Sequence, residues 1–265
     1  MSLTWTEWLT HSSNNNVYFL VNTLASPNPV KRFYAQDWIE EALPIYHGTA
    51  LAHLSDIGPW LIKTKPSQLR NLGVALDREP FHDNSWGWAY HSQLAWRDQI
   101  THWQKHQLVL INKEKRVFRF FDSRVARTLI PHLERADWAL LMMPIEDCFI
   151  ECGETNATFS RPKYGEPFIS PADYRLSEHL MKVWRNSEQS FSNIVDNFYF
   201  QFWEKQTAWA VQLDEQEGYL KTLIHEWMEE NQKNNRDITF LDDEIFINYL
   251  KTHPNVQPNI EIIND

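Results

Sequence analysis

The stretch LVLINKEKRVFRFFDSRV, residues 108–125, contains a strand pair and the start of a helix, and it decides the class of fold. Apolar runs at 108–111 and 116–121 flank the polar turn 112–115, a pattern that predicts a β-hairpin. Asp122 follows directly, and an aspartate in that place is typical of the residue that caps the N-terminus of a helix. Strands and helices therefore alternate within one folding unit.

Apolar runs with the length of strands continue on both sides of this hairpin. They lie at 17–21, 49–54, 58–62, 86–92 and 145–150. A helix from 93 to about 106, with Ser92 as its expected cap, connects the run at 86–92 to the hairpin. This alternation predicts an α/β lobe that contains a mixed sheet.

The pattern changes after Ser170 and Pro171, which read as an N-cap followed by the first position of a helix. Helical periodicity then runs almost to the end of the chain, near 171–186, 188–212, 215–234 and 241–253. We therefore predict an α+β fold with two lobes. The α/β lobe covers 1–168, and an acidic, all-helical lobe covers 169–265.

The net charge of −10 over 265 residues is concentrated in the last third of the chain. Residues 1–186 contain 20 acidic and 20 basic residues, whereas residues 187–265 contain 15 acidic and 5 basic ones. This balance excludes nucleic acid as an expected partner, because phosphate binding needs clustered Lys and Arg. No apolar stretch approaches the roughly 18 residues of a membrane span. The first basic residue is Lys31, so the basic region of a signal peptide is missing, and we expect a cytoplasmic protein without a membrane partner.

Named enzyme motifs are absent from this sequence, which has only 7 glycines. Phosphate-binding, dinucleotide-binding and nucleophile-elbow patterns all need glycines that the chain lacks. The segment from His225 to Glu229 resembles a zinc-protease helix, but Glu229 stands where the second histidine ligand is required. An ordinary exposed helix face explains the same residues, so we predict no catalytic residue and no cofactor.

Four further residues have the types that bind zinc: His102 and His106, one helical turn apart, and the two cysteines Cys148 and Cys152. A fold that brought them together would give a Cys₂His₂ set, but helix histidines and small buried thiols explain them as well. If 145–152 is a strand, the two cysteine Cα atoms lie about 13 Å apart, which is too far for a disulfide. A helix would bring them closer, so that conclusion depends on the strand.

Arg119 lies in apolar surroundings within the predicted strand and needs an acidic partner, because an unpaired buried charge is costly. Asp122 and Arg124 are placed to join it at the strand–helix junction. We interpret the three residues as an ion-pair cluster that fixes this junction. A role of Arg119 in binding a partner or in catalysis stays open as the alternative.

The predicted helix at 188–212 is apolar on more than one side. Its core stripe consists of Phe191, Ile194, Val195, Phe198 and Phe202. Tyr199, Phe200 and Trp203 fall outside that stripe at 100° per residue. Such a helix is either covered on both sides by the core or offers one side to another protein. We treat Tyr199, Phe200 and Trp203 as the candidate partner-binding residues.

Two motifs of this chain resemble the adaptor chaperones of the type VI secretion system (Tap or TEC type). The first is Trp86-Gly87-Trp88-Ala89-Tyr90-His91-Ser92, and the second is the segment 118–125, in which Ser123 replaces the proline usual in that family. The segments 18–21 and 58–61 occur in the family's order as well, so the resemblance covers about 16–150. The motif residues expected to have structural roles are Trp86, Gly87, Ser92, Arg119, Asp122 and Arg124.

The resemblance implies a non-enzymatic role in the cytoplasm of a Gram-negative bacterium. Proteins of this family bind one cognate effector and help to load it onto the VgrG spike protein, and no catalytic residues are known for them. By this resemblance the expected partners are an effector and VgrG. Two alternatives remain: an immunity-type inhibitor of a toxin, and a metal-dependent enzyme with an unrecognised site.

Overall fold

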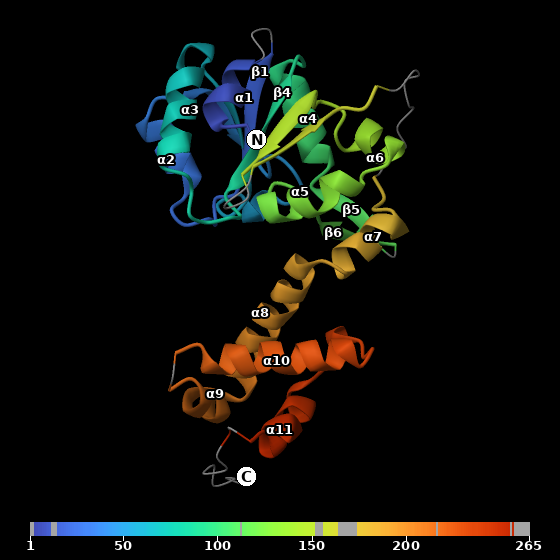
Figure 1. Ribbon diagram of the computed structural model, residues 1–265. Helices are drawn as coiled ribbons and strands as arrows, with labels where there is room; N and C mark the ends of the chain where they lie inside the picture. Colours follow the sequence, from blue (N-terminus) through green and yellow to red (C-terminus); the bar gives the residue numbers. More distant parts are fainter. Residues whose placement is uncertain are drawn as a thin grey trace. The chain divides into compact units, whose positions relative to one another are not determined.

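The computed structural model describes residues 3–11, 15–111, 113–151, 156–163, 174–215, 217–254 and 256 (Figure 1). The chain divides into two compact units, residues 1–184 and 185–265. Half of the molecule is helical with an antiparallel sheet confined to the first unit, which confirms the α+β class. The predicted lobe boundary at 168/169 lies outside the described residues. Helix α7 (Glu178–Arg185), which we expected in the helical lobe, packs Leu180 into the core of the first unit.

A six-stranded sheet forms the centre of the first unit. Its strands lie in the order β2 (Ile39–Pro44), β3 (Trp60–Thr64), β1 (Asn16–Val21), β4 (Gly87–Ser92), β7 (Asp147–Ile150) and β8 (Ala157–Ser160). Every neighbouring pair in it is antiparallel, so the expectation of a mixed sheet was wrong. Parallel neighbours need a long crossover connection, and the connection 151–156 between β7 and β8 is too short for one.

Helices cover both faces of this sheet, so the first unit has three layers (Figure 1). Phe19 and Ala89 point to the face covered by α1 (Trp5–His11), α2 (Pro29–Ala35) and α3 (Leu69–Arg78). Tyr18 and Trp88 point to the opposite face, where α4 (Trp96–Lys105), α5 (Ser123–Leu129), α6 (Arg135–Leu140) and α7 pack. Short 3₁₀ turns complete the unit at Ala52–Leu54, Pro66–Gln68 and Ile130–His132. Because both faces are covered, all six residues of β4 are buried.

The hairpin of the opening stretch is present, but it is shorter than predicted. Strand β5 (Leu108–Ile111) pairs with β6 (Glu114–Val117), so β6 begins two residues earlier than expected and residues 118–121 are not a strand. Phe118, Phe120 and Phe121 are buried, whereas Val117 is 44% exposed. The predicted strand over 116–121 was therefore wrong beyond Val117, and the three phenylalanines enter the core from an irregular segment.

The apolar run at 49–54 is also not a strand. Residues 49–51 form a turn that leads into the 3₁₀ turn at Ala52–Leu54. The Thr49 hydroxyl donates to the Tyr46 carbonyl and accepts from the Leu51 amide. A threonine that satisfies local backbone groups in this way favours a turn over a strand.

The second unit is helical throughout its described part. It contains α8 (Glu188–Lys205), α9 (Thr207–Leu213), α10 (Tyr219–Lys233), a 3₁₀ turn at Ile238–Phe240 and α11 (Asp243–Thr252). The helix predicted over 188–212 is broken at Gln206, whose φ of −125° and ψ of 46° are not helical. Asp242 caps α11 by accepting from the Ile245 amide at 2.9 Å. Phe198, Trp227 and Phe246 meet in a separate hydrophobic core.

Candidate partner-binding surface

The three candidate residues lie on one side of α8, in the second unit. The Phe200 side chain is 64% exposed, while Tyr199 and Trp203 are half-buried. The Tyr199 ring is 5.5 Å from the Phe200 ring and 6.4 Å from the Trp203 ring, both edge-on. Val195, Phe198 and Phe202 occupy the buried side, as the predicted core stripe requires, while Tyr199 and Trp203 pack against the edge of the same core and Phe200 is the exposed ring. We call Tyr199, Phe200 and Trp203 the α8 aromatic patch.

Tyr199 is fixed at the base of this patch by a hydrogen bond. Its hydroxyl donates to Asp214 Oδ2 at 2.9 Å, and Asp214 Oδ1 accepts from the Gly218 amide at 3.1 Å. Burial, followed by the bond to Asp214, raises the pKa of Tyr199 above its usual value. Tyr199 therefore joins α8 to the segment before α10 and supports the exposed ring of Phe200.

Carboxylates lie one helical turn on each side of Phe200. Asp196 Oδ1 pairs with Lys221 Nζ at 2.6 Å. Glu204 is exposed and has no ion-pair partner among the residues that the structure describes. Exposed Asn197 and Gln201 complete the surroundings. An exposed aromatic ring within a polar, acidic rim has the composition of a small protein-binding surface.

Other large apolar side chains are exposed in the second unit. Phe240 is 81% exposed, Val211 54% and Ile245 40%. Sequence periodicity missed Phe240 because it lies in a short 3₁₀ turn rather than on a regular helix face. The Asp237 cap, which accepts from the Thr239 amide at 3.0 Å, was the local signal for that turn.

The tryptophan–glycine motif lies inside the first unit and has structural roles. Trp86 is buried and donates through Nε1 to Glu151 Oε2 at 3.0 Å. Gly87 has a φ of +142°, and a Cβ there would lie 2.2 Å from the Leu20 carbonyl oxygen. Only glycine fits this position. Ser92 does not cap the helix directly, since α4 begins at Trp96; its Oγ accepts from Gln99 Nε2 at 2.6 Å.

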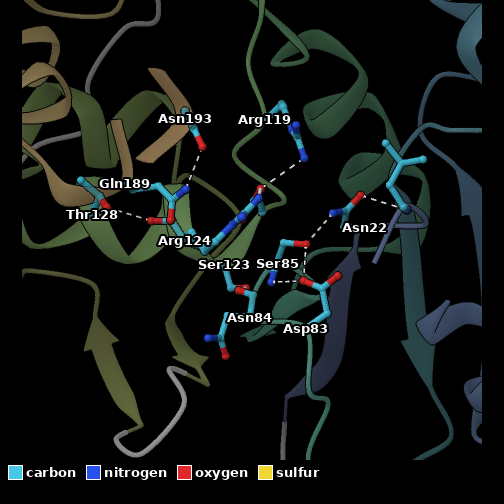
Figure 2. Close-up of polar contacts among 12 residues, drawn as sticks. Asn22, Asp83, Asn84, Ser85, Arg119, Ser123, Arg124, Thr128, Gln189 and Asn193 are labelled. Atoms are coloured by element: carbon cyan, nitrogen blue, oxygen red, sulfur yellow. Dashed lines mark hydrogen bonds and ion pairs between the residues drawn. The ribbon is translucent and has the colours of Figure 1, made fainter. Parts of the chain in front are cut away.

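The second motif forms the expected ion-pair cluster (Figure 2). Arg124 binds both carboxylate oxygens of Asp122, with Nε–Oδ1 at 3.0 Å and Nη2–Oδ2 at 2.8 Å. Arg119 Nη2 lies 3.3 Å from Asp122 Oδ2, and its side chain is 48% exposed rather than buried. Asp122 also caps α5 by accepting from the Arg124 amide. The cluster holds the junction between the hairpin and α5.

A second polar group fixes the segment that leads into β4 (Figure 2). Asp83 accepts from the Ser85 amide at 2.8 Å and from the Ser85 hydroxyl at 2.7 Å, while Asn22 Nδ2 donates to that hydroxyl. Burial by itself would raise the pKa of Asp83, but these hydrogen bonds, with that from the Ser26 amide, lower it. The Ser123 hydroxyl donates to the Asn84 carbonyl, two residues before the first motif, and Trp88 Nε1 donates to the Phe120 carbonyl, so the two motifs of the sequence meet in space.

The candidate metal ligands do not form a site in the described part of the chain, where no group of three His, Cys, Asp or Glu side chains is arranged to hold an ion. His102 Nε2 lies 2.8 Å from the Leu141 carbonyl, and burial, followed by the charge of His106, lowers the pKa of His102 to about 3. Burial raises the pKa of the Cys148 thiol, while Cys152 lies outside the described residues. His225 is exposed, Glu229 is half-buried, and their side chains lie 3.9 Å apart.

Residues 17–140 match the model of a protein family described as a domain of unknown function, DUF4123. That domain is known from effector chaperones and adaptors of type VI secretion. The matched segment runs from β1 to the end of α6 and contains both motifs. No curated protein and no solved structure matches the chain. Within the described residues, no helix has the length and hydropathy needed to cross a lipid bilayer.

Proposed function

We propose that this protein is a non-enzymatic adaptor chaperone. It binds a cognate type VI effector in the bacterial cytoplasm and promotes loading of that effector onto the VgrG spike. The observation that carries the proposal is the match of residues 17–140 to a domain associated with such adaptors. Two features support it: the motif residues have structural roles in the first unit, and the second unit exposes an aromatic patch.

The α8 aromatic patch is the proposed effector contact. Phe200 would insert into an apolar pocket of the effector, since aromatic side chains commonly dominate the energy of protein interfaces. Glu204, which has no ion-pair partner among the described residues, would favour a partner with a basic residue beside that pocket. The half-buried Tyr199, which also contacts Trp203, supports the Phe200 ring, so less entropy is lost on binding.

Co-expression with the effector encoded beside this protein tests the proposal. The wild-type protein should form a stoichiometric complex, measured by affinity capture and light scattering, and effector yield should fall when the adaptor is omitted. Phe200→Ala should weaken the complex at least tenfold. Leu24→Ala, which removes a 58% exposed side chain from the first unit, is the matched control and should bind normally.

A growth assay of effector toxicity and an assay of metal-dependent turnover separate this function from its two alternatives. An adaptor leaves the toxicity of the effector intact, whereas an immunity protein abolishes it in a growth assay. Well-folded protein that binds neither the effector nor VgrG would contradict the proposal. Catalytic turnover that depends on added metal would favour the enzyme alternative instead.

A further inference from the structure

A groove with a basic rim lies between α2 and α3 of the first unit, on the side of the sheet opposite the ion-pair cluster of Arg119 and Arg124. Its volume is about 320 Å³, and its lining includes Arg32, Trp38, Arg70, Val74, Arg78 and Glu79. The two helices lie side by side in Figure 1, where α3 is drawn in teal. None of these residues belongs to the two sequence motifs, and none has a role in the proposed function.

Arg32 forms a fixed cationic wall of this groove. Its Nη1 donates to the Glu79 carbonyl at 2.7 Å and its Nη2 to the Ala75 carbonyl at 3.1 Å, so it closes the C-terminus of α3. The guanidinium carbon lies 5.0 Å from the Phe81 ring and 5.9 Å from the Trp38 ring. These contacts hold α2 against α3 and determine the shape of the groove.

The outer rim of the groove carries two arginines without a partner. Arg70, Val74 and Arg78 are exposed and follow each other at four-residue intervals on α3. Neither Arg70 nor Arg78 makes an ion pair or a side-chain hydrogen bond with any residue that the structure describes. Because a helix rises 1.5 Å per residue, their Cα atoms lie about 12 Å apart, with the apolar Val74 between them.

The nearby carboxylates are already engaged. Asp77, the residue before Arg78, accepts from the Trp5 amide at 2.7 Å and the Thr6 amide at 3.0 Å, which anchors α1. The Glu79 carboxylate lies 3.6 Å from Arg32 Nη2 and balances that charge. Arg70 and Arg78 thus leave the groove with an excess of positive charge, on a chain whose net charge is −10.

We propose that this groove is a second docking site, which binds an acidic segment of a partner protein in extended form. The pattern acid–x–apolar–x–acid fits it, because in a strand the first and last of five residues lie about 13 Å apart and share a face with the middle one. The two carboxylates would pair with Arg70 and Arg78, in the bidentate geometry that favours arginine, and the apolar residue would contact Val74. Nucleic acid is disfavoured, since two unpaired arginines neutralise few phosphates.

Fluorescence anisotropy at low salt tests this site directly. The probe is a fluorescein-labelled peptide with the core Glu-Thr-Leu-Thr-Glu, and the matched probe has glutamine in place of both glutamates. The acidic peptide should bind the wild-type protein at least tenfold more tightly than the glutamine peptide. Arg70→Glu/Arg78→Glu should lower that affinity at least tenfold, and raising the salt concentration should weaken binding to the wild type.

Helix α4 provides a control with the same charge and spacing. Arg97 and Lys105 are exposed, lie eight residues apart and have Thr101 between them, but they do not line this groove. Arg97→Glu/Lys105→Glu should leave peptide binding within twofold of wild type. Circular dichroism checks the fold of both variants, and Arg70→Gln/Arg78→Gln repeats the test without introducing new negative charge.

Three results would overturn the proposal. The first is equal loss of affinity in the α3 and α4 variants, which would indicate only the overall charge. The second is stronger binding of an oligothymidylate of equal length, which would assign the site to nucleic acid. The third is wild-type self-association that the α3 reversal abolishes in light scattering, which would make a second copy of this chain the occupant. The Phe200→Ala experiment tests only the proposed effector contact on α8. Its result therefore neither supports nor contradicts the proposal for this groove.

Discussion

Strand β4 and helix α8 are both rich in aromatic residues, yet they use them in opposite ways. All six residues of β4 are buried, and the polar atoms of the Trp88 and Tyr90 side chains have partners inside the protein. Trp88 Nε1 donates to the Phe120 carbonyl at 2.7 Å, and the Tyr90 hydroxyl donates to Gln99 Oε1 at 2.8 Å. On α8, the Phe200 ring is 64% exposed. One of the two motifs that carry the family resemblance thus builds the scaffold, while the candidate contact lies in the part without that resemblance.

The largest effect expected from this difference is at Gly87. Gly87→Ala places a Cβ 2.2 Å from the Leu20 carbonyl oxygen at a φ of +142°, so β1 and β4 must separate. We expect a loss of about 4 kcal/mol or more in the free energy of unfolding, or no soluble protein. Urea denaturation of the purified variant measures it.

Gly48 gives the matched control for this substitution. It also has a positive φ, +72°, but a Cβ there meets nothing within 4 Å. Gly48→Ala should therefore cost only about 1 kcal/mol, the backbone strain alone. Equal stability losses at both glycines would show that close strand packing is not the reason for the glycine in the motif.

A smaller effect is expected from breaking the hydrogen-bond chain on β4. Trp103 Nε1 donates to the Tyr90 hydroxyl at 2.7 Å, and that hydroxyl donates to Gln99. Tyr90→Phe leaves both partners buried and unsatisfied, at a cost of about 2–4 kcal/mol. Tyr18→Phe removes one bond, to the Leu94 carbonyl, and should cost about 1 kcal/mol in the same denaturation experiment. A Tyr90→Phe variant as stable as Tyr18→Phe would argue against a cooperative network.

The stability of the first unit should depend on pH through Glu151, the carboxylate that accepts a hydrogen bond from the motif residue Trp86. Burial raises the pKa of the Glu151 carboxyl to about 7, although the hydrogen bond from Trp86 lowers it in part. The folded state therefore holds this proton more tightly than the unfolded chain, whose glutamate pKa is about 4.3. Stability from this group is present at low pH and is lost as the pH rises from about 4.5 through 7.

Glu151→Gln removes this titration and retains an acceptor for Trp86. Between pH 5 and pH 8, the wild type should lose about 2 kcal/mol relative to the variant, an order-of-magnitude figure from the shift in pKa. His102 titrates with the opposite sign, but it is present in both proteins and does not affect the difference. Parallel pH profiles of the two proteins in thermal unfolding would contradict the prediction.

The buried strands of the first unit could be predicted from the sequence more reliably than the elements at its edges and surface. The strands at 17–21 and 86–92 could be predicted because burial on both faces requires continuous apolar runs. Edge strand β2 was missed, since its sequence IEEALP is half-buried and interrupted by charge. Helices α2 and α3 were missed as well, because each is short and presents polar residues over much of its surface.

The candidate site was predicted only in part. Helical periodicity separated the α8 aromatic patch from the core stripe, but it could not tell which ring is exposed, because that depends on the Tyr199–Asp214 bond formed across the loop before α10. The arginine groove gave no signal at all. Arg32 and Arg78 are 46 positions apart and meet only after α2 and α3 pack, so charge patterning along the chain could not reveal it.

The smallest effect on stability is expected at Phe200, and it completes the comparison. Phe200→Ala should change the free energy of unfolding by less than about 0.5 kcal/mol, because the ring is mostly in solvent. Phe198→Ala, two residues earlier on the same helix, should cost about 3–5 kcal/mol, because Phe198 packs against Trp227 and Phe246. If Phe200→Ala destabilised the protein as much as Phe198→Ala, its ring would belong to the core and the α8 aromatic patch would no longer be a contact surface. A stable variant that fails to bind the effector would instead identify a side chain that is kept for its partner rather than for the fold.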